Sequence, residues 1–237
     1  MVKNNSMQFL FGDRELIVKV ADLLAAPVDV IVNPANGGLS HGGGVAAKIS
    51  HQGGDVIQHE SDLFIKEHGM LESGMVAFTS AGKLPYEAVI HAVGPRMGEG
   101  HEQKKIEQAV ASSLMLCNMH DWNSVAFPAI STGIFGVPVD VAARAFYRAI
   151  TSFWDARMDS APEKVIICLT EKNFQAFFDA FRLESKQPDD LSQESINNKS
   201  KVGIKQLSEA ELPVGEIELS EKDISELDND EVNDWFK

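Results

Sequence analysis

Residues 30–36 (VIVNPAN) are followed shortly by residues 41–45 (HGGGV), and these two segments are the most informative part of the chain about its fold. Residues 127–136 (FPAISTGIFG) show the same arrangement later in the chain. In both places an apolar strand pattern ends in small residues, and a helical pattern follows. Such a junction places bare backbone N–H groups and a helix N-terminus at the rim of a sheet, where a phosphate can bind. Two junctions of this kind suit a ligand with two phosphates.

Strand and helix patterns alternate over the first 183 residues. We expect strands at 7–11, 15–20, 28–32, 74–79, 87–93, 124–130 and 164–169. We expect helices at 44–51, 55–67, 102–120, 139–154 and 173–183, and a short turn or helix at 22–26. This order predicts a three-layer α/β/α domain of the α/β class, in which helices cover both faces of a mixed, mostly parallel sheet. The opening hairpin is expected to add an antiparallel edge.

Charge and composition divide the chain into two parts. The net charge is −14, and the segment 184–237 holds 15 of the 35 acidic and 6 of the 21 basic residues. Such a segment buries too little apolar surface to offset its ordering entropy. We therefore expect a folded domain over 1–183 and an acidic, mostly disordered tail over 184–237. Two interpretations of the tail stay open: a solvating segment, or one that folds through 219–236 against a protein partner.

Several classes of function are not expected from the composition. Neither part carries the basic face that binding to duplex nucleic acid requires. No signal peptide is recognised, and no apolar run is long enough to span a bilayer, so we expect no membrane association. Cys117 and Cys168 share no metal-binding spacing, which predicts two reduced, buried thiols and no metal site. These features favour a cytoplasmic or nuclear protein, and we expect no cofactor.

A dinucleotide-binding fingerprint is one alternative interpretation of the first glycine loop. Gly42-x-Gly44-x-x-Ala47 matches its degenerate form, and Asp62 lies near the expected acidic position. That fingerprint needs its glycines in the tight turn directly after the strand, whereas here a long polar segment comes between. The chain contains neither G-x-x-x-x-G-K-[ST] nor G-x-S-x-G, which excludes a P-loop ATPase and the usual nucleophile elbow.

Four segments together resemble the macrodomain family. They are 30–36, 42–45, 83–95 (KLPYEAVIHAVGP) and 131–136, and they occur in the family's order and approximate spacing. The resemblance covers about residues 7–183, and it is similar to macrodomains of viral replicase proteins and those attached to ADP-ribosyltransferases. It implies a mixed sheet between helical layers and a cleft for ADP-ribose. It also implies recognition of ADP-ribose attached to proteins, or its removal.

The resemblance also implies which residues bind ADP-ribose. Asp22 matches the acid that accepts a hydrogen bond from the adenine amino group, although it also fits an N-cap of the following turn. The glycine loop matches the segment that wraps the diphosphate, and Phe135 matches a ring that packs on the distal ribose. The complete implied set is Asp22, Leu23, Asn36, Gly42, Gly43, Gly44, Val45, Ser131, Thr132, Gly133, Ile134, Phe135 and Thr170.

Two polar residues near the first loop are the candidates for catalysis. Asn36 resembles the amide that holds the distal ribose hydroxyls, and an amide that both donates and accepts can fix a diol and position water. His41 matches a histidine near the distal ribose, where it could orient Asn36 or relay a proton, although a lone histidine is more often a loop residue. Asn33 is expected to be structural, with its side chain bonded to backbone at the strand end.

The sequence departs from the family pattern at four positions. The best-known hydrolase branch carries an acid directly after the glycine loop, where this chain has Ala46, although viral-type members also lack it and cleave ADP-ribosyl esters. Thr170 stands where similar members often place an aromatic residue that stacks on adenine. Ala21 replaces a usual glycine, so the turn must avoid positive φ. Pro34 replaces a usual alanine and stiffens the turn.

These observations predict a hydrolase that binds ADP-ribose and removes mono-ADP-ribose from acidic side chains of proteins. The expected partners are thus ADP-ribose and mono-ADP-ribosylated proteins. A non-catalytic reader of ADP-ribosylated proteins would use the same cleft, and the absence of an acid at Ala46 favours it. An O-acetyl-ADP-ribose deacetylase or ADP-ribose 1″-phosphate phosphatase would also use this pocket.

Overall fold

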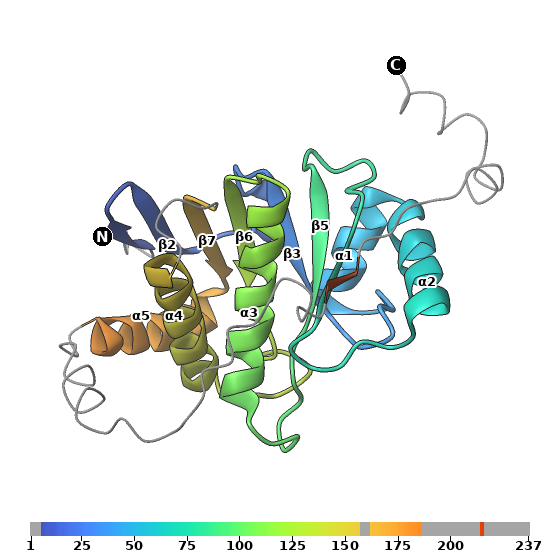
Figure 1. Ribbon diagram of the computed structural model, residues 1–237. Helices are drawn as coiled ribbons and strands as arrows, with labels where there is room; N and C mark the ends of the chain where they lie inside the picture. Colours follow the sequence, from blue (N-terminus) through green and yellow to red (C-terminus); the bar gives the residue numbers. More distant parts are fainter. Residues whose placement is uncertain (1–5, 157–161, 186–213, 216–237) are drawn as a thin grey trace, which may run out of the picture.

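One mixed β-sheet runs through the computed structural model, which describes residues 6–156, 162–185 and 214–215 (Figure 1). Its strand order is β1-β2-β7-β6-β3-β5-β4-β8. The strands are β1 (Ser6–Phe11), β2 (Arg14–Val20), β3 (Val30–Ala35), β4 (Val76–Thr79), β5 (Ala88–Val93), β6 (Ser124–Pro128), β7 (Lys164–Leu169) and β8 (Val214–Gly215). The helices are the 3₁₀ turn η1 (Leu23–Ala25), α1 (Gly44–Gly53), α2 (Val56–His68), α3 (Glu102–Met119), α4 (Val139–Ala156) and α5 (Glu171–Glu184).

The predicted three-layer α/β/α architecture is confirmed. Strands β2, β7, β6, β3 and β5 are parallel, and β1 forms the expected antiparallel edge with β2. Strand β4 also pairs antiparallel with β5, which the alternating pattern did not predict. The segment between these two strands contains no helix, and a parallel connection would need a longer crossover.

Alternating side chains of the central strands fill two separate cores. Val30 and Val32 face the layer of α3, α4 and α5, whereas Ile31 between them packs with Ile49 of α1 and Ile57 of α2. All three of these β3 residues are fully buried. This continuous apolar run is what a parallel strand covered on both faces requires. Among the described helices, none is long and apolar enough to cross a membrane.

Strand β3 extends to Ala35, further than the expected end at residue 32. Beyond Ile31 it no longer pairs with β6, but Asn33, Pro34 and Ala35 continue to pair with β5. Proline has no N–H to donate, so it fits a strand segment that has a neighbour on one side only. The same separation leaves a gap between the ends of β3 and β6.

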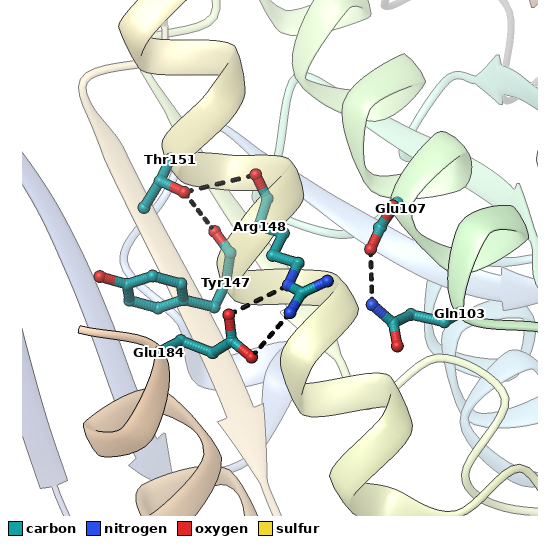
Figure 2. A network of polar contacts seen from close by, with 6 residues as sticks. All are labelled: Gln103, Glu107, Tyr147, Arg148, Thr151 and Glu184. Carbon is teal, nitrogen blue, oxygen red and sulfur yellow. Dashed lines mark hydrogen bonds and ion pairs between the residues drawn. The ribbon is translucent and has the colours of Figure 1, made fainter. Parts of the chain in front are cut away.

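Helix α5 continues through Glu184, the first residue after the predicted domain of residues 1–183. The Arg148 guanidinium of α4 donates two hydrogen bonds to the Glu184 carboxylate, at 3.0 and 3.2 Å (Figure 2). This pair joins the last turn of α5 to α4, and it raises the pKa of Arg148. Val214 and Gly215 form β8 beside β4. The other tail residues beyond Ser185 lie outside the described residues, so the predicted disorder and the protein partner of the tail stay predictions.

We expect Glu184→Gln to lower the free energy of unfolding by about 1 kcal/mol, because it removes a two-point ion pair whose acidic partner is largely shielded from water. Urea unfolding at low salt measures this change. Glu163→Gln is the matched control, since Glu163 is an exposed residue before β7. Equal stability of the two variants would contradict the assignment of Glu184 to the folded domain.

Candidate functional site

A cavity of about 770 Å³ opens at the carboxyl ends of β3, β5, β6 and β7. It lies where β3 and β6 separate, and its walls come from the segments that follow these strands. Its lining includes every predicted ligand-binding residue: Asp22, Leu23, Asn36, Gly42, Gly43, Gly44, Val45, Ser131, Thr132, Gly133, Ile134, Phe135 and Thr170. Of the fourteen predicted site residues, His41 alone is missing from this lining.

The first wall of the cavity is the glycine loop at the start of α1. Gly43 is the N-cap of this helix, with an extended backbone and no side-chain capping bond. Gly44 has a φ of +59°, a conformation that favours glycine. Within the described chain, the N–H groups of residues 42–45 donate no hydrogen bond, and the first turn of α1 has no acidic residue. The loop therefore presents free donors and the positive end of a helix dipole to the cavity.

The second wall, residues 131–135, is held in a strained shape. Ser131 has a φ of +66°, and its buried hydroxyl oxygen has no hydrogen-bond partner among the described residues. This loop packs tightly on the end of β5, because a Cβ atom at Gly94 would lie 2.1 Å from the Ser131 Oγ. A strained residue with an unpaired hydroxyl in a cavity wall is typical of a ligand-binding position.

Asp22 lies in the cavity lining and serves as the N-cap of η1. Its Oδ1 accepts a hydrogen bond from the Leu24 N–H at 3.2 Å, so the N-cap interpretation is confirmed. Its Oδ2 lies 2.6 Å from the Lys48 ammonium, which lowers the pKa of this carboxyl. Both structural contacts leave the carboxylate in the cavity lining. Ala21 is absent from the residues with positive φ, as its replacement of glycine requires.

Asn36 also lies in the cavity lining, and its side chain braces the turn that follows β3. Its Oδ1 accepts hydrogen bonds from the N–H groups of Gly38 and Ser40, and its Nδ2 donates to the Ser40 carbonyl at 2.7 Å. Both lone pairs of the amide oxygen are thus occupied by backbone N–H groups. One Nδ2 hydrogen has no partner among the described residues and can be donated to a ligand.

His41 lies beneath the loop and is 6% exposed. Its Nδ1 lies 3.1 Å from the Asn33 Nδ2, and its Nε2 lies 2.9 Å from the Ser61 Oγ. Neither ring nitrogen contacts Asn36 in the structure. The expected orientation of Asn36 by His41, and a proton relay from it, are therefore not supported by this geometry. His41 instead ties the glycine loop to α2.

Asn33 joins His41 to a second buried histidine, His91 of β5. Its Nδ2 also lies 3.0 Å from the His91 Nδ1, and the two imidazoles stack with centroids 4.8 Å apart. The expectation that the Asn33 side chain bonds to backbone is wrong. The bonded partners are side chains, because β3 extends past Asn33 and the ladder with β5 satisfies its main chain.

The partners of this cluster assign the histidine tautomers. An amide nitrogen with two hydrogens can donate to both Nδ1 atoms, so each histidine carries its proton on Nε2. His41 then donates to Ser61, which donates to the Ile57 carbonyl, and His91 donates to Thr79, which donates to the Ser80 carbonyl. Burial lowers the pKa of both histidines, and that of His91 falls well below its usual value. The cluster is therefore neutral.

Among the lining residues that were not predicted from the sequence, three have long polar or charged side chains. Lys48 pairs with Asp22, and Asn173 at the start of α5 donates to the Thr132 hydroxyl at 3.3 Å. The Arg96 guanidinium lies over the Phe135 ring, 4.5 Å from its centroid. The only available signal was the position of Arg96 directly after the Val93–Pro95 end of the KLPYEAVIHAVGP segment. Cys117 and Cys168 are buried free thiols, and the described residues contain no group of side chains suited to a metal ion.

The neutral histidine pair predicts a loss of stability in mild acid. The unfolded chain takes up protons on histidine below pH about 6.5, whereas the folded chain resists them. The free energy of unfolding is thus expected to fall by about 1.4 kcal/mol per pH unit below that value for each histidine that stays neutral. Urea unfolding at pH 7.5 and 5.5 measures the slope.

His91→Gln is the matched comparison for this slope, and it is expected to show a shallower loss than the wild type. Burial raises the pKa of Glu60, which acts in the opposite direction, but it acts equally on both proteins. Identical pH dependence in the two proteins would contradict the neutral state of His91.

Comparisons with known proteins agree with this geometry. The model of the family described as Macro domain matches residues 32–146. An O-acetyl-ADP-ribose deacetylase of Salmonella typhimurium is 37% identical over 172 residues, which cover 71% of this chain and 93% of that protein. The human protein mono-ADP-ribosyltransferase PARP14 is 38% identical over 173 residues, which cover 70% of this chain but 10% of that protein.

Solved structures show the same fold. A mutant of the Oceanobacillus iheyensis macrodomain with ADPR has a TM-score of 0.72 and 26% identity, covering 77% of this chain and all of that one. The same macrodomain with ADP has a TM-score of 0.71 and 28% identity, covering 76% of this chain and 97% of that one. From the family match, the identities and the shared fold together, this chain belongs to the Macro domain family.

Proposed function

We propose that the cleft binds ADP-ribose and that the protein hydrolyses the ester between mono-ADP-ribose and an acidic side chain of a protein. The observation that carries the proposal is the glycine loop, with its free N–H donors, facing the loop that carries the unpaired Ser131 hydroxyl. A pyrophosphate supplies the oxygen acceptors that such donors lack. The macrodomain with ADPR is a solved relative with this fold, which supports the same ligand here.

The lining suggests how ADP-ribose would lie in the cleft. The Asp22 carboxylate would accept a hydrogen bond from the adenine amino group, with Lys48 holding that carboxylate in place. The diphosphate would lie between the two loops. The distal ribose would lie at the opposite end, between the Phe135 ring and the free N–H of Asn36. Thr170 offers no ring for stacking, so adenine recognition would depend on the Asp22 end.

Catalysis in this arrangement would depend on orientation. Asp22 is the sole carboxylate in the described lining, and it lies at the adenine end. Ala46 provides no acid, and His41 is buried below the loop. A base for the attacking water would therefore come from the ligand's own phosphate or from solvent. The protein would hold the distal ribose between the loops and Asn36, so that water meets its anomeric carbon in a fixed geometry.

Asn36→Ala is expected to retain ADP-ribose binding and to lose most turnover, because the distal ribose loses its amide contact. The loss of kcat is expected to be roughly tenfold or more, as for one lost hydrogen bond at a reacting centre. Release of ADP-ribose from a mono-ADP-ribosylated protein measures turnover, and calorimetry with ADP-ribose measures binding. A variant that loses both equally would contradict this role, since collapse of the turn would then explain the result.

Gly43→Val is expected to abolish ADP-ribose binding without unfolding the protein. The backbone of Gly43 is extended, so any residue can adopt it, but a Cβ there would lie 3.7 Å from Ile134 across the cleft. A Cβ at Gly44 meets no neighbour, so valine there would act through its positive φ. Calorimetry and thermal melting of Gly43→Val test the cleft, and unchanged binding would contradict the proposed path of the diphosphate.

A second candidate is the deacetylation of O-acetyl-ADP-ribose, which the 37% identical relative of that name favours. It also hydrolyses an ester of ADP-ribose, with a smaller acyl group. The rates of hydrolysis of a mono-ADP-ribosylated protein and of O-acetyl-ADP-ribose, measured under the same conditions, show which activity is greater. A protein that binds ADP-ribose and its conjugates but cleaves neither ester would instead be a reader.

A further inference from the structure

A second cavity, of about 510 Å³, adjoins the cleft at its Asn36 end. The two cavities share Asn36, Gly94, Arg96 and Phe135 in their walls. The far wall of the second cavity comes from residues 70–73 and from Glu99 and Lys105 near the start of α3. In the proposed pose the distal ribose ends between Asn36 and Phe135. The second cavity therefore lies beyond the sugar, on the side that no part of ADP-ribose occupies.

Arg96 stands at the junction of the two cavities, and the structure holds its backbone firmly. Its N–H donates to one oxygen of the Glu99 carboxylate at 3.0 Å, and the Lys105 ammonium lies 2.7 Å from the other. The next residue, Met97, donates its N–H to the Phe135 carbonyl at 2.8 Å. These contacts fix the turn that carries Arg96 against the loop that carries Phe135.

The guanidinium of Arg96 is exposed and available to a ligand. It lies over the Phe135 ring, and within the described residues no carboxylate pairs with it. The nearby Glu99 is already committed to Lys105, a contact that lowers the pKa of Glu99 to about 2 and keeps it charged. A guanidinium binds a carboxylate through two parallel hydrogen bonds. The junction thus offers a free, oriented cation directly beside the proposed position of the distal ribose.

We propose that this second cavity, here called the acceptor cavity, receives the acidic side chain that carries ADP-ribose, with Arg96 facing its carboxyl group. This inference rests on the proposed ester substrate. In hydrolysis, water forms a bond to the anomeric carbon while the bond from that carbon to the ester oxygen breaks. The electron pair leaves with the carboxylate, and the water proton passes to a phosphate oxygen or to solvent. Arg96 stabilises the carboxylate as its charge develops.

The rest of the acceptor cavity fits the aliphatic stem of such a side chain. Leu71 is half-buried in the wall, and Met70 beside it is 74% exposed. The Leu71 N–H donates to the Gly37 carbonyl at 2.8 Å, so this wall is tied to the turn after Asn36. A glutamate stem could therefore lie on apolar surface while its carboxyl group reaches Arg96. An acetyl group would leave most of this cavity empty.

The affinities of the protein for two ligands test the acceptor cavity independently of the cleft. One ligand is free ADP-ribose, and the other is a short peptide that carries ADP-ribose on a single glutamate. Calorimetry is done in the full chain with Asn36→Ala, so that the ester stays intact. Arg96→Gln removes the cation, and Met70→Trp narrows the cavity. Arg182→Gln and Met119→Trp are the matched controls, since both of these exposed residues are absent from either cavity.

We expect Arg96→Gln and Met70→Trp to raise the Kd of the modified peptide roughly tenfold, as for one lost charged hydrogen bond or a comparable obstruction. Met70 lies outside the cleft, so Met70→Trp is expected to leave the Kd of free ADP-ribose unchanged, whereas Arg96→Gln, at a residue that also lines the cleft, is expected to raise that Kd less than the Kd of the peptide. Both control variants are expected to leave the Kd of both ligands unchanged. An unchanged Kd for the peptide would overturn the proposal. So would an equal rise for both ligands, because Arg96 and Met70 would then act on ADP-ribose itself.

Failure of the proposed hydrolysis and failure of the acceptor cavity give different results in these experiments. If the wild type cleaves no ester, hydrolysis is wrong, but the same comparison done in the wild-type protein still supports or overturns the acceptor cavity. If free ADP-ribose binds but the modified peptide is excluded, the cleft stands and the acceptor cavity does not.

Discussion

The separation of β3 from β6 after Ile31 is the constraint on which the site depends. Up to that point the two strands pair in parallel, and beyond it β3 stays with β5 while β6 stays with β7. The chain leaves β3 toward α1 and α2 on one face of the sheet, and it leaves β6 toward α4 on the other. A crevice forms where neighbouring parallel strands lead in opposite directions, and ligands of open α/β sheets bind there. Both loops that line the cleft begin at this crevice.

The buried cluster of Asn33, His41 and His91 holds one side of the crevice in place. Its hydrogen bonds run from α2 through the glycine loop to β3 and β5, so the loop is anchored from below while its N–H groups stay free above. One atom of this cluster, the Asn33 Oδ1, has no hydrogen-bond partner among the described residues. Turning the amide over would leave two donors unpaired in its place, so the observed orientation is the better one. The histidine that the sequence offered as catalytic therefore has a structural environment.

Much of the fold could be predicted from the sequence because local signals and tertiary structure agree. The alternation of strands and helices and the antiparallel hairpin followed from local patterns, whereas the thirteen cavity residues were implied by the resemblance of four segments to the macrodomain family. The sequence is least informative where distant segments meet. The buried position of His41 depends on Ser61 and His91, and the pairing of Glu184 depends on Arg148, partners that no local pattern identifies. Arg96 was missed for the same reason, since its guanidinium is placed at the cleft by the Phe135 ring, which lies in another loop.

The central claim is that two facing peptide loops bind the pyrophosphate of a nucleotide sugar. A crystal structure of the protein soaked with ADP-ribose would show whether the nucleotide sugar binds in this way. We expect the diphosphate between Gly43 and Ser131, adenine at Asp22 and the distal ribose between Asn36 and Phe135. A nucleotide bound elsewhere, or a cleft that stays empty at saturating ligand, would contradict the claim.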